Sequence, residues 1–240
     1  MQRFATSLIV NTETVKSYYF IPLFLLILIV DVVFNNIESF IAFRIFSKPL
    51  VSITLLIFYY SNSKKRPRKE RVSIILCLLS LFFGDIFLLE NTPVHSFPAG
   101  LFAFFMANVF YSMVLYRSAN LEVNKSYPFL IVAAIYLFTI FYLMYDKLNG
   151  YFVPVLIYIF AVLNMIQAAF LRYKVVNNYS FVLVFTGALL FLFSESLLAL
   201  NKFYTPVPYK NVLIMMLYGL SQLLIIMGIL REQKKFRRFD

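Results

Sequence analysis

Long apolar runs separated by short polar segments make up most of the chain from Tyr18 onward. The runs are continuous rather than alternating, which predicts helices and excludes a membrane-spanning β-barrel. Roughly 20 apolar residues are enough for a helix to cross a bilayer. The pattern predicts about eight such helices, near Tyr18–Phe34, Phe46–Tyr60, Val72–Leu89, Phe97–Tyr116, Ser126–Tyr145, Tyr151–Leu171, Ser180–Leu200 and Asn211–Leu230.

The composition supports an all-α integral membrane protein built as a polytopic helix bundle. Hydrophobic residues make up 62% of the 240 positions and charged residues only 14%, against about 45–50% and about 25% in ordinary globular domains. This excludes a disordered chain, a nucleic-acid-binding domain and an ordinary soluble enzyme. Eight helices use about 160 residues and leave about 80 for loops and tails, so residues 1–240 are expected to form a single transmembrane domain.

Lysine and arginine are distributed unevenly between alternate loops. If the N-terminus lies inside, 17 of the 22 Lys and Arg residues fall on the inner side, with the densest group at residues 64–71. Positive residues mark the cytoplasmic side, so we expect both termini in the cytoplasm, most simply at a bacterial inner membrane. The group at 64–71 is interpreted as a topology anchor, with anionic lipid or nucleic acid as the alternative ligand; no nucleic-acid partner is expected.

Four ionisable residues lie within or beside the predicted spans: Asp31, Lys48, Asp85 and Glu195. Each costs about 2.5–3.5 kcal/mol to insert, so such groups usually mark functional sites. At 1.5 Å per residue, Asp85 and Glu195 lie about 6–8 Å below the outer boundary, and Lys48 starts its span at the same level. These three are therefore expected to share a depth in the outer half of the bundle. Asp31 is expected either within the membrane or solvated at its surface.

The segments around the two predicted outer acids resemble each other. Residues 81–89 align with residues 191–199, so that Asp85 falls opposite Glu195. One interpretation is a weak parallel duplication of about 18–117 and 126–230, with a site at the interface of the halves. The alternative is chance similarity between apolar helices.

Short motifs recur along most of the chain in a specific order. They are Lys48-Pro49-Leu50, Gly84-Asp85 with Leu88-Leu89, Gly100–Phe104 leading to Tyr111, Pro154–Tyr158 with Met165, Gly187–Phe191 leading to Ser194–Ala199, and Tyr218 with Gln222. In this order and spacing they resemble the YhhN-like membrane proteins, a family that includes the lysoplasmalogenases.

The resemblance implies hydrolysis of the vinyl ether bond of a lysophospholipid, which releases a fatty aldehyde and a glycerophospho-alcohol. It carries the two catalytic acids of the family over to Asp85 and Glu195, and the lysine of its Lys-Pro motif to Lys48. Two residues depart from the family pattern, because Glu195 stands where Asp is usual and Asn108 where His is usual. Asparagine hydrogen-bonds but does not titrate. Asn108 can therefore replace a histidine that only orients a partner, but it cannot replace one that carries a proton.

Vinyl ether cleavage needs the two carboxyl groups in different protonation states. One protonates carbon, and the other stabilises the resulting cation or activates water. Neither a metal nor a cofactor is required, and which acid is the proton donor stays open. Lys48, with Arg44, is expected to bind the headgroup phosphate; the alternative for Lys48 is a structural ion pair with Asp85 or Glu195.

Further polar side chains at membrane depth are candidates for substrate binding. They are Asn108, Tyr111, Tyr158, Asn164, Tyr218 and Gln222. Hydrogen bonding between helices is the alternative for the two asparagines and the glutamine.

Two other functions fit the sequence. One is a proton-coupled carrier of a small or lipid-like solute, and the other is a non-catalytic lipid-binding membrane protein. Depth discriminates the carrier from the hydrolase, since a carrier site is expected near the midplane and a hydrolase site near one leaflet. The departures at Glu195 and Asn108 are what favours the non-catalytic protein. The expected partners are a lysophospholipid substrate and membrane lipids.

Overall fold

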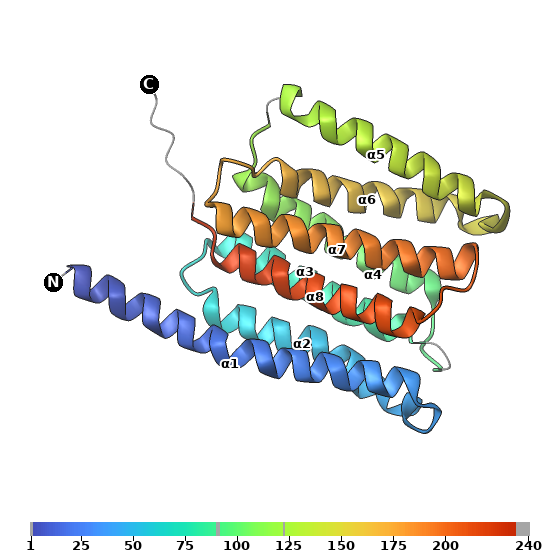
Figure 1. Ribbon diagram of the computed structural model, residues 1–240, viewed down its shortest axis with the longest axis horizontal. Coiled ribbons are helices and arrows are strands. Elements are labelled where there is room, and N and C mark those ends of the chain that lie inside the picture. Colours follow the sequence, from blue (N-terminus) through green and yellow to red (C-terminus); the bar gives the residue numbers. More distant parts are fainter. Residues whose placement is uncertain (1, 90–91, 122, 234–240) are drawn as a thin grey trace.

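The protein is all-helical over residues 2–89, 92–121 and 123–233, which are the residues that the computed structural model describes. The α-helices are α1 Gln2–Asn36, α2 Arg44–Asn62, α3 Arg68–Phe87, α4 Phe97–Leu115, α5 Val123–Met144, α6 Phe152–Phe170, α7 Asn178–Phe203 and α8 Lys210–Leu230 (Figure 1). Short 3-10 segments at Glu38–Phe43, Tyr116–Ser118, Tyr145–Lys147 and Asn149–Tyr151 lie between them. The prediction of an all-α bundle is confirmed.

Seven of the described helices are long and apolar enough to cross a membrane, and α3 is the exception. Helix α3 has the length, but it begins with Arg68-Lys69-Glu70-Arg71 and carries Asp85 near its end. Its neighbours in the bundle are α2 and α4, so it runs alongside spanning helices. The charges that set α3 apart therefore lie at its two ends.

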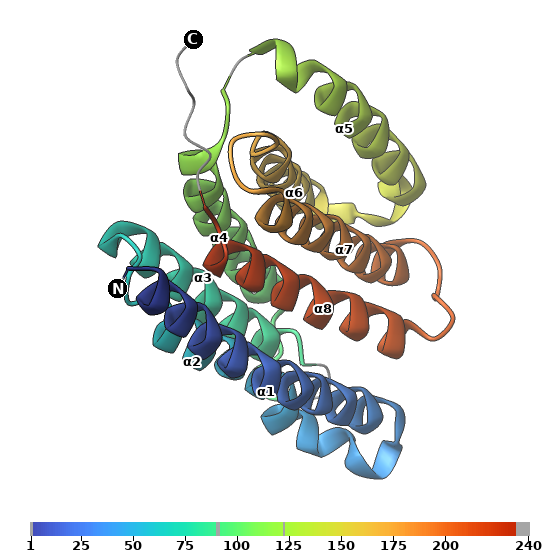
Figure 2. The ribbon, with the colours of Figure 1, turned by 60° about the vertical axis from the view of Figure 1, so that its left-hand side comes forward.

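Helices α4, α6 and α8 form the centre of the bundle, and α1 and α5 lie at its edges (Figures 1 and 2). Half or more of the apolar stretch of each central helix is buried, against 17% for α1 and α5. Helix α1 begins and α8 ends at the same end of the bundle. We call this the terminal end, and the end where α4 and α8 begin the site end.

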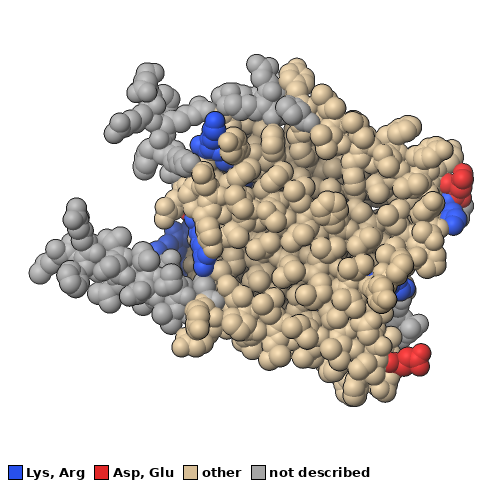
Figure 3. Space-filling view, viewed as in Figure 1, with Lys and Arg blue, Asp and Glu red and all other residues tan. Residues whose placement is uncertain are grey.

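The outer surface matches a protein embedded in lipid. On the face drawn in Figure 3, charged side chains lie only at the two ends, and the broad middle is uncharged. Large apolar side chains such as Phe46, Phe102 and Phe138 are exposed on the surface of the bundle. A soluble protein rarely leaves so much apolar surface in water, so the chain is a multi-pass integral membrane protein. Its orientation stays a prediction, and four of the basic residues that support it lie in 234–240, outside the described residues.

Helices α7 and α8 approach closely because glycine occupies the contact. A Cβ atom added to Gly187 would lie 2.9 Å from the Ser221 carbonyl oxygen and 2.8 Å from Ile225. Backbone cannot move aside as a flexible side chain does, so the small residue sets the distance between the helices. Ser52 on α2, Asp85 on α3 and Tyr218 on α8 meet beside this pair.

We expect Gly187→Ala to destabilise the protein by about 1–3 kcal/mol, because overpacking a tight contact exceeds the gain in helix propensity. The measurement is the melting temperature in detergent, followed by circular dichroism. Gly150→Ala is the matched control, since no heavy atom lies within 4 Å of a Cβ added there. Equal melting temperatures for the two variants would show that the α7–α8 contact tolerates a methyl group.

Candidate active site

Asp85 is buried at the site end of α3, where two hydroxyl groups hold one of its oxygens. Ser52 Oγ and the Tyr218 hydroxyl donate to Asp85 Oδ2 at 2.6 and 3.0 Å. Lys48 Nζ lies 3.9 Å from Oδ1, which has no hydrogen-bond donor among the described residues. The carboxylate is thus fixed through one oxygen, while the other is free to meet a ligand.

Glu195 has a different environment from that of Asp85. It lies on α7, partly buried, and accepts a hydrogen bond of 2.7 Å from the Tyr158 hydroxyl. No described lysine or arginine forms an ion pair with Glu195. One acid therefore has a cation and two hydroxyl donors, and the other has a single hydroxyl donor.

Both acids line one cavity of about 120 Å³, which we call the polar cavity. The predicted convergence of Lys48, Asp85 and Glu195 at one depth agrees with this geometry. The other polar residues of the lining are Asn35, Arg44, Ser194, Asn201, Lys210, Asn211 and Tyr218. A second cavity of about 240 Å³ shares Asn35, Arg44, Lys210 and Asn211 and lies nearer the end of the bundle.

Lys210, Asn35 and Asn211 are additions that the sequence did not reveal. The Asn211 side chain donates to the Asn35 carbonyl oxygen at 2.9 Å, which joins the end of α1 to the start of α8. All three residues lie at the ends of predicted helices, where polar side chains are common, so the sequence did not single them out. The contact between Asn35 and Asn211 exists only because α1 and α8 are neighbours.

Asp31 is fully buried and holds Arg44. It accepts a hydrogen bond of 2.5 Å from Ser47 Oγ, and Arg44 lies 3.6 Å from its second oxygen. The interpretation of Asp31 as a solvated surface acid is therefore wrong. Its carboxylate positions Arg44 at the mouth of the polar cavity.

The remaining predicted binding residues fall into three places. Tyr158 and Tyr218 bond directly to the two acids. Tyr111 and Gln222 pair with each other at 2.7 Å, one helical turn further from the site end than Tyr218. Asn108 Nδ2 donates to the Phe104 carbonyl oxygen at 2.8 Å, while its buried Oδ1 has no donor among the described residues.

Asn164 does not join the other predicted residues. Its side chain is exposed and accepts a hydrogen bond of 2.8 Å from Tyr116, which directly follows α4 at the opposite end of the bundle. It lines neither the polar cavity nor the cavity beside it. This geometry matches the alternative of hydrogen bonding between helices.

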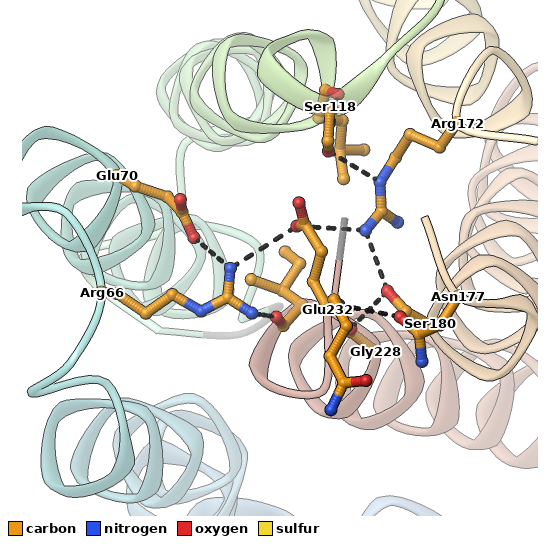
Figure 4. Close-up of polar contacts among 11 residues, drawn as sticks. Arg66, Glu70, Ser118, Arg172, Asn177, Ser180, Gly228 and Glu232 are labelled. Carbon is orange, nitrogen blue, oxygen red and sulfur yellow. Dashed lines mark hydrogen bonds and ion pairs between the residues drawn. The ribbon is translucent and has the colours of Figure 1, made fainter. Parts of the chain in front are cut away.

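A network of buried charged side chains lies at the terminal end of the bundle (Figure 4). Arg172 is fully buried and reaches Ser118 Oγ at 3.1 Å, Ser180 Oγ at 2.9 Å and Glu232 at 3.2 Å. Glu232 also lies 3.5 Å from Arg66, which pairs with Glu70 at 2.8 Å. Burial lowers the pKa of Arg172, and the Glu232 carboxylate opposes that shift.

The network ties the ends of several helices together through backbone as well as side chains. Arg66 donates to the Ile229 carbonyl oxygen, and Ser180 donates to that of Gly228 at 2.7 Å. Cations and donors at these carbonyls stabilise the C-terminal end of α8. The sequence pattern indicated only a topology role for Arg66 and Arg172, so this network was missed.

The described residues offer acid–base groups rather than metal ligands. No three of their His, Cys, Asp and Glu side chains gather closely enough to hold a metal ion. The polar cavity instead combines two carboxyl groups in unlike environments with three cations and several amide groups. Such a site can bind an anion and move a proton.

Comparison with known proteins identifies the family of this chain. No solved structure matches the chain. The YhhN family model matches residues 43–229, a range that runs from the start of α2 nearly to the end of α8 and includes both acids of the polar cavity. The chain therefore belongs to the YhhN family.

Proposed function

We propose that the protein is a membrane-embedded hydrolase of the lysoplasmalogenase type. It cleaves the vinyl ether bond of a lysophospholipid to a fatty aldehyde and a glycerophospho-alcohol. The observation that carries this proposal is that two carboxyl groups in unlike environments, Asp85 and Glu195, line one cavity with Arg44, Lys48 and Lys210. Membership of the YhhN family supports it.

We assign Glu195 as the proton donor and Asp85 as the ionised partner. Ser52, Tyr218 and Lys48 surround Asp85 with donors and positive charge, which favours its carboxylate form. Glu195 has a single hydroxyl donor and no ion pair with a described residue, which favours its neutral form in a partly apolar site. Two carboxyl groups held in opposite states are what general acid–base catalysis requires.

The reaction then follows the chemistry of an enol ether. Glu195 gives its proton to the vinyl carbon remote from oxygen, and an oxocarbenium ion forms that the Asp85 carboxylate stabilises. Water adds to the carbon attached to oxygen and loses a proton to a carboxylate. The bond to the glycerol oxygen then breaks: the glycerol oxygen takes up that proton, and the hemiacetal hydroxyl gives its own proton to the carboxylate as the aldehyde forms. Aldehyde and alcohol leave. In the net reaction the substrate and one water molecule give the aldehyde and the alcohol, and both carboxyl groups return to their starting protonation states.

Arg44, Lys48 and Lys210 are assigned to the headgroup phosphate. Asp31 offsets the charge of Arg44, and Asp85 that of Lys48. Lys210 forms no ion pair with a described acid and lines both the polar cavity and the cavity beside it. Its charge is therefore the one most available to a phosphate.

We expect Lys210→Gln to raise KM about 10-fold or more with kcat changed less than about 2-fold, because a hydrogen bond to a charged group contributes about 1.5–3 kcal/mol. Steady-state kinetics on a lysophospholipid substrate measures both constants. Lys147→Gln is the matched control, since Lys147 lies at the same end but bonds to the Tyr204 carbonyl oxygen outside both cavities. A fall in kcat at constant KM would contradict the phosphate assignment.

A carrier is the second candidate, and the terminal end argues against it. Alternating access that moved α3 or α6 against α8 would separate Arg66 or Arg172 from Glu232, which are buried or partly buried pairs. Breaking such pairs by exposing one partner costs several kcal/mol. Asp85 also lies two residues before the end of α3 rather than at mid-helix, as suits a site facing one leaflet.

We further propose that both termini face the cytoplasm of a bacterial cell, with the protein in its inner membrane. The basic residues at the terminal end, including Arg66 and Arg172, support this orientation. The polar cavity then opens toward the outer leaflet.

The deciding experiment is aldehyde release by the purified protein in detergent micelles. The substrates are a vinyl ether lysophospholipid and its saturated alkyl ether counterpart with the same headgroup. Aldehyde is expected from the vinyl ether alone, because only an enol ether is protonated on carbon. Absence of aldehyde from a folded protein would contradict the hydrolase. Lysophospholipid flux across proteoliposomes would then identify a carrier, and binding without flux a non-catalytic protein.

A further inference from the structure

An apolar cavity of about 40 Å³ lies between α4, α5, α6 and α7. Its walls include Phe97, Tyr136, Ile140, Ile159, Leu192 and Phe203. The polar groups at its edge satisfy one another, since the Tyr136 and Ser196 hydroxyls lie 2.5 Å apart and Tyr158 bonds to Glu195. Nothing else in the lining offers a charge, so the cavity suits a hydrocarbon.

The apolar cavity and the polar cavity meet at one acid. Glu195 and Leu198 line both of them. A molecule that filled the two cavities would be polar on the Asp85 side of Glu195 and apolar on the other. The boundary between its head and its chain would lie against the Glu195 carboxyl group. In a vinyl ether lysolipid that boundary is the reacting double bond.

Helix α5 forms the outer wall of the apolar cavity and is weakly held. Only 17% of its apolar stretch is buried, against 50% for α4 and α6. Figure 2 draws it at the edge of the bundle, beyond α6 and α7. The bond between Tyr136 and Ser196 links it to α7 one residue from Glu195.

The bilayer side of α5 carries a second apolar space. A groove of about 970 Å³ runs between α5 and α6 and is lined by Phe138, Phe141, Phe152 and Leu156 among others. The apolar cavity itself is close to the ~30 Å³ that one water molecule occupies in the liquid. A long chain therefore extends beyond the cavity. The groove shares no lining residue with the cavity, but neighbouring positions of the same two helices line both spaces: Tyr136 and Ile140 beside Leu137 and Phe141 on α5, and Val155 beside Leu156 on α6.

We propose that the apolar cavity beneath α5 binds the single hydrocarbon chain of an amphiphile whose head lies in the polar cavity. This rests on the proposed function for the position of the head. One apolar cavity adjoins Glu195, so a lysolipid with one chain fits the pair of cavities. A diacyl lipid would leave its second chain against polar walls.

The protein contains no tryptophan, so a single introduced tryptophan reports its own surroundings by fluorescence. Phe203→Trp places the reporter in the wall of the apolar cavity, where Phe203 is 5% exposed. Phe193→Trp is the matched control, because Phe193 lies on the same helix and is 55% exposed. The probe is a lysophosphocholine whose ester-linked acyl chain carries two bromine atoms, which quench tryptophan on contact. An ester-linked probe has no vinyl ether to cleave, so the measurement is independent of turnover.

We expect saturable quenching of the Phe203→Trp protein in detergent, with half-quenching at a probe fraction at least 10-fold lower than for Phe193→Trp. Unbrominated lysophosphocholine should reverse it. Dibrominated diacyl phosphocholine should quench the two reporters alike. If Phe203→Trp perturbs folding, Tyr136→Trp reports from the α5 wall of the same cavity.

Parallel quenching of both cavity reporters and Phe193→Trp would overturn the chain site. Aldehyde release together with parallel quenching would support the hydrolase and contradict only the proposed site for the hydrocarbon chain. Saturable quenching without aldehyde release would retain the chain site and overturn the proposed catalysis. The two proposals therefore fail separately.

Discussion

Asp85→Asn and Glu195→Gln are each expected to reduce aldehyde release by about 10²–10⁴-fold, which is the usual contribution of a general acid or base. The amides keep the size of the side chains and can accept the hydrogen bonds of Tyr218 and Tyr158. Folding should therefore persist, with melting temperatures close to that of the wild type. Initial rates of aldehyde formation and melting curves in the same detergent measure the two effects.

Two further variants separate the carboxyl chemistry from charge in general. Glu38→Gln removes an exposed acid from the same end of the bundle and should leave turnover unchanged. Glu195→Asp keeps the acid with one methylene fewer, so it should release aldehyde faster than Glu195→Gln. Full activity in both amide variants would refute the two-carboxylate mechanism.

The fold was predictable because it depends on local composition. Most of the apolar runs are long enough to span a bilayer, and each must satisfy its backbone within its own helix. Helix α3 was predicted as a helix despite its charges, since Arg68–Arg71 lie at one end and Asp85 near the other. The proposed duplication of about 18–117 and 126–230 stays a prediction.

The shared level of the charged residues in the candidate site was predictable from depth along the helices. Rise per residue places Lys48, Asp85 and Glu195 at one level without any knowledge of packing. Rotation about each helix axis is a different matter, because an apolar helix has no polar face to orient it. Asn164 was assigned to the site for its depth in the membrane, and its side chain faces out of the bundle.

Contacts between segments far apart in the chain could not be predicted from the sequence. Ser52 is 33 residues from Asp85, and Asn35 is 176 residues from Asn211. Neither spacing carries a signal, since Ser52 lies inside an apolar helix where serine is ordinary, and asparagine is common at helix ends such as those of Asn35 and Asn211. The network around Arg172 was missed for the same reason, because Glu232 lies 60 residues further along the chain. Positive charge near a membrane surface predicts topology, and buried pairing becomes visible only in the fold.

The second large effect is expected at this network. Arg172→Met should destabilise the protein by about 3–5 kcal/mol, because it leaves the Glu232 carboxylate buried with one partner fewer. It also removes the donors to Ser118 and Ser180. Denaturant unfolding followed by circular dichroism in detergent measures the free energy. Lys65→Met removes an exposed cation from the same end and should change stability by less than about 0.5 kcal/mol.

The double variant Arg172→Met/Glu232→Gln distinguishes an unpaired charge from lost packing. If the cost of Arg172→Met comes from the Glu232 charge, neutralising that charge should recover part of it, as in any coupled pair. Equal losses in the single and double variants would assign the cost to packing around residue 172. Turnover supplies a second discriminant, because the polar cavity lies at the other end of the bundle. Below its lowered melting temperature, Arg172→Met should release aldehyde at the wild-type rate, whereas Asp85→Asn should melt normally and release almost none.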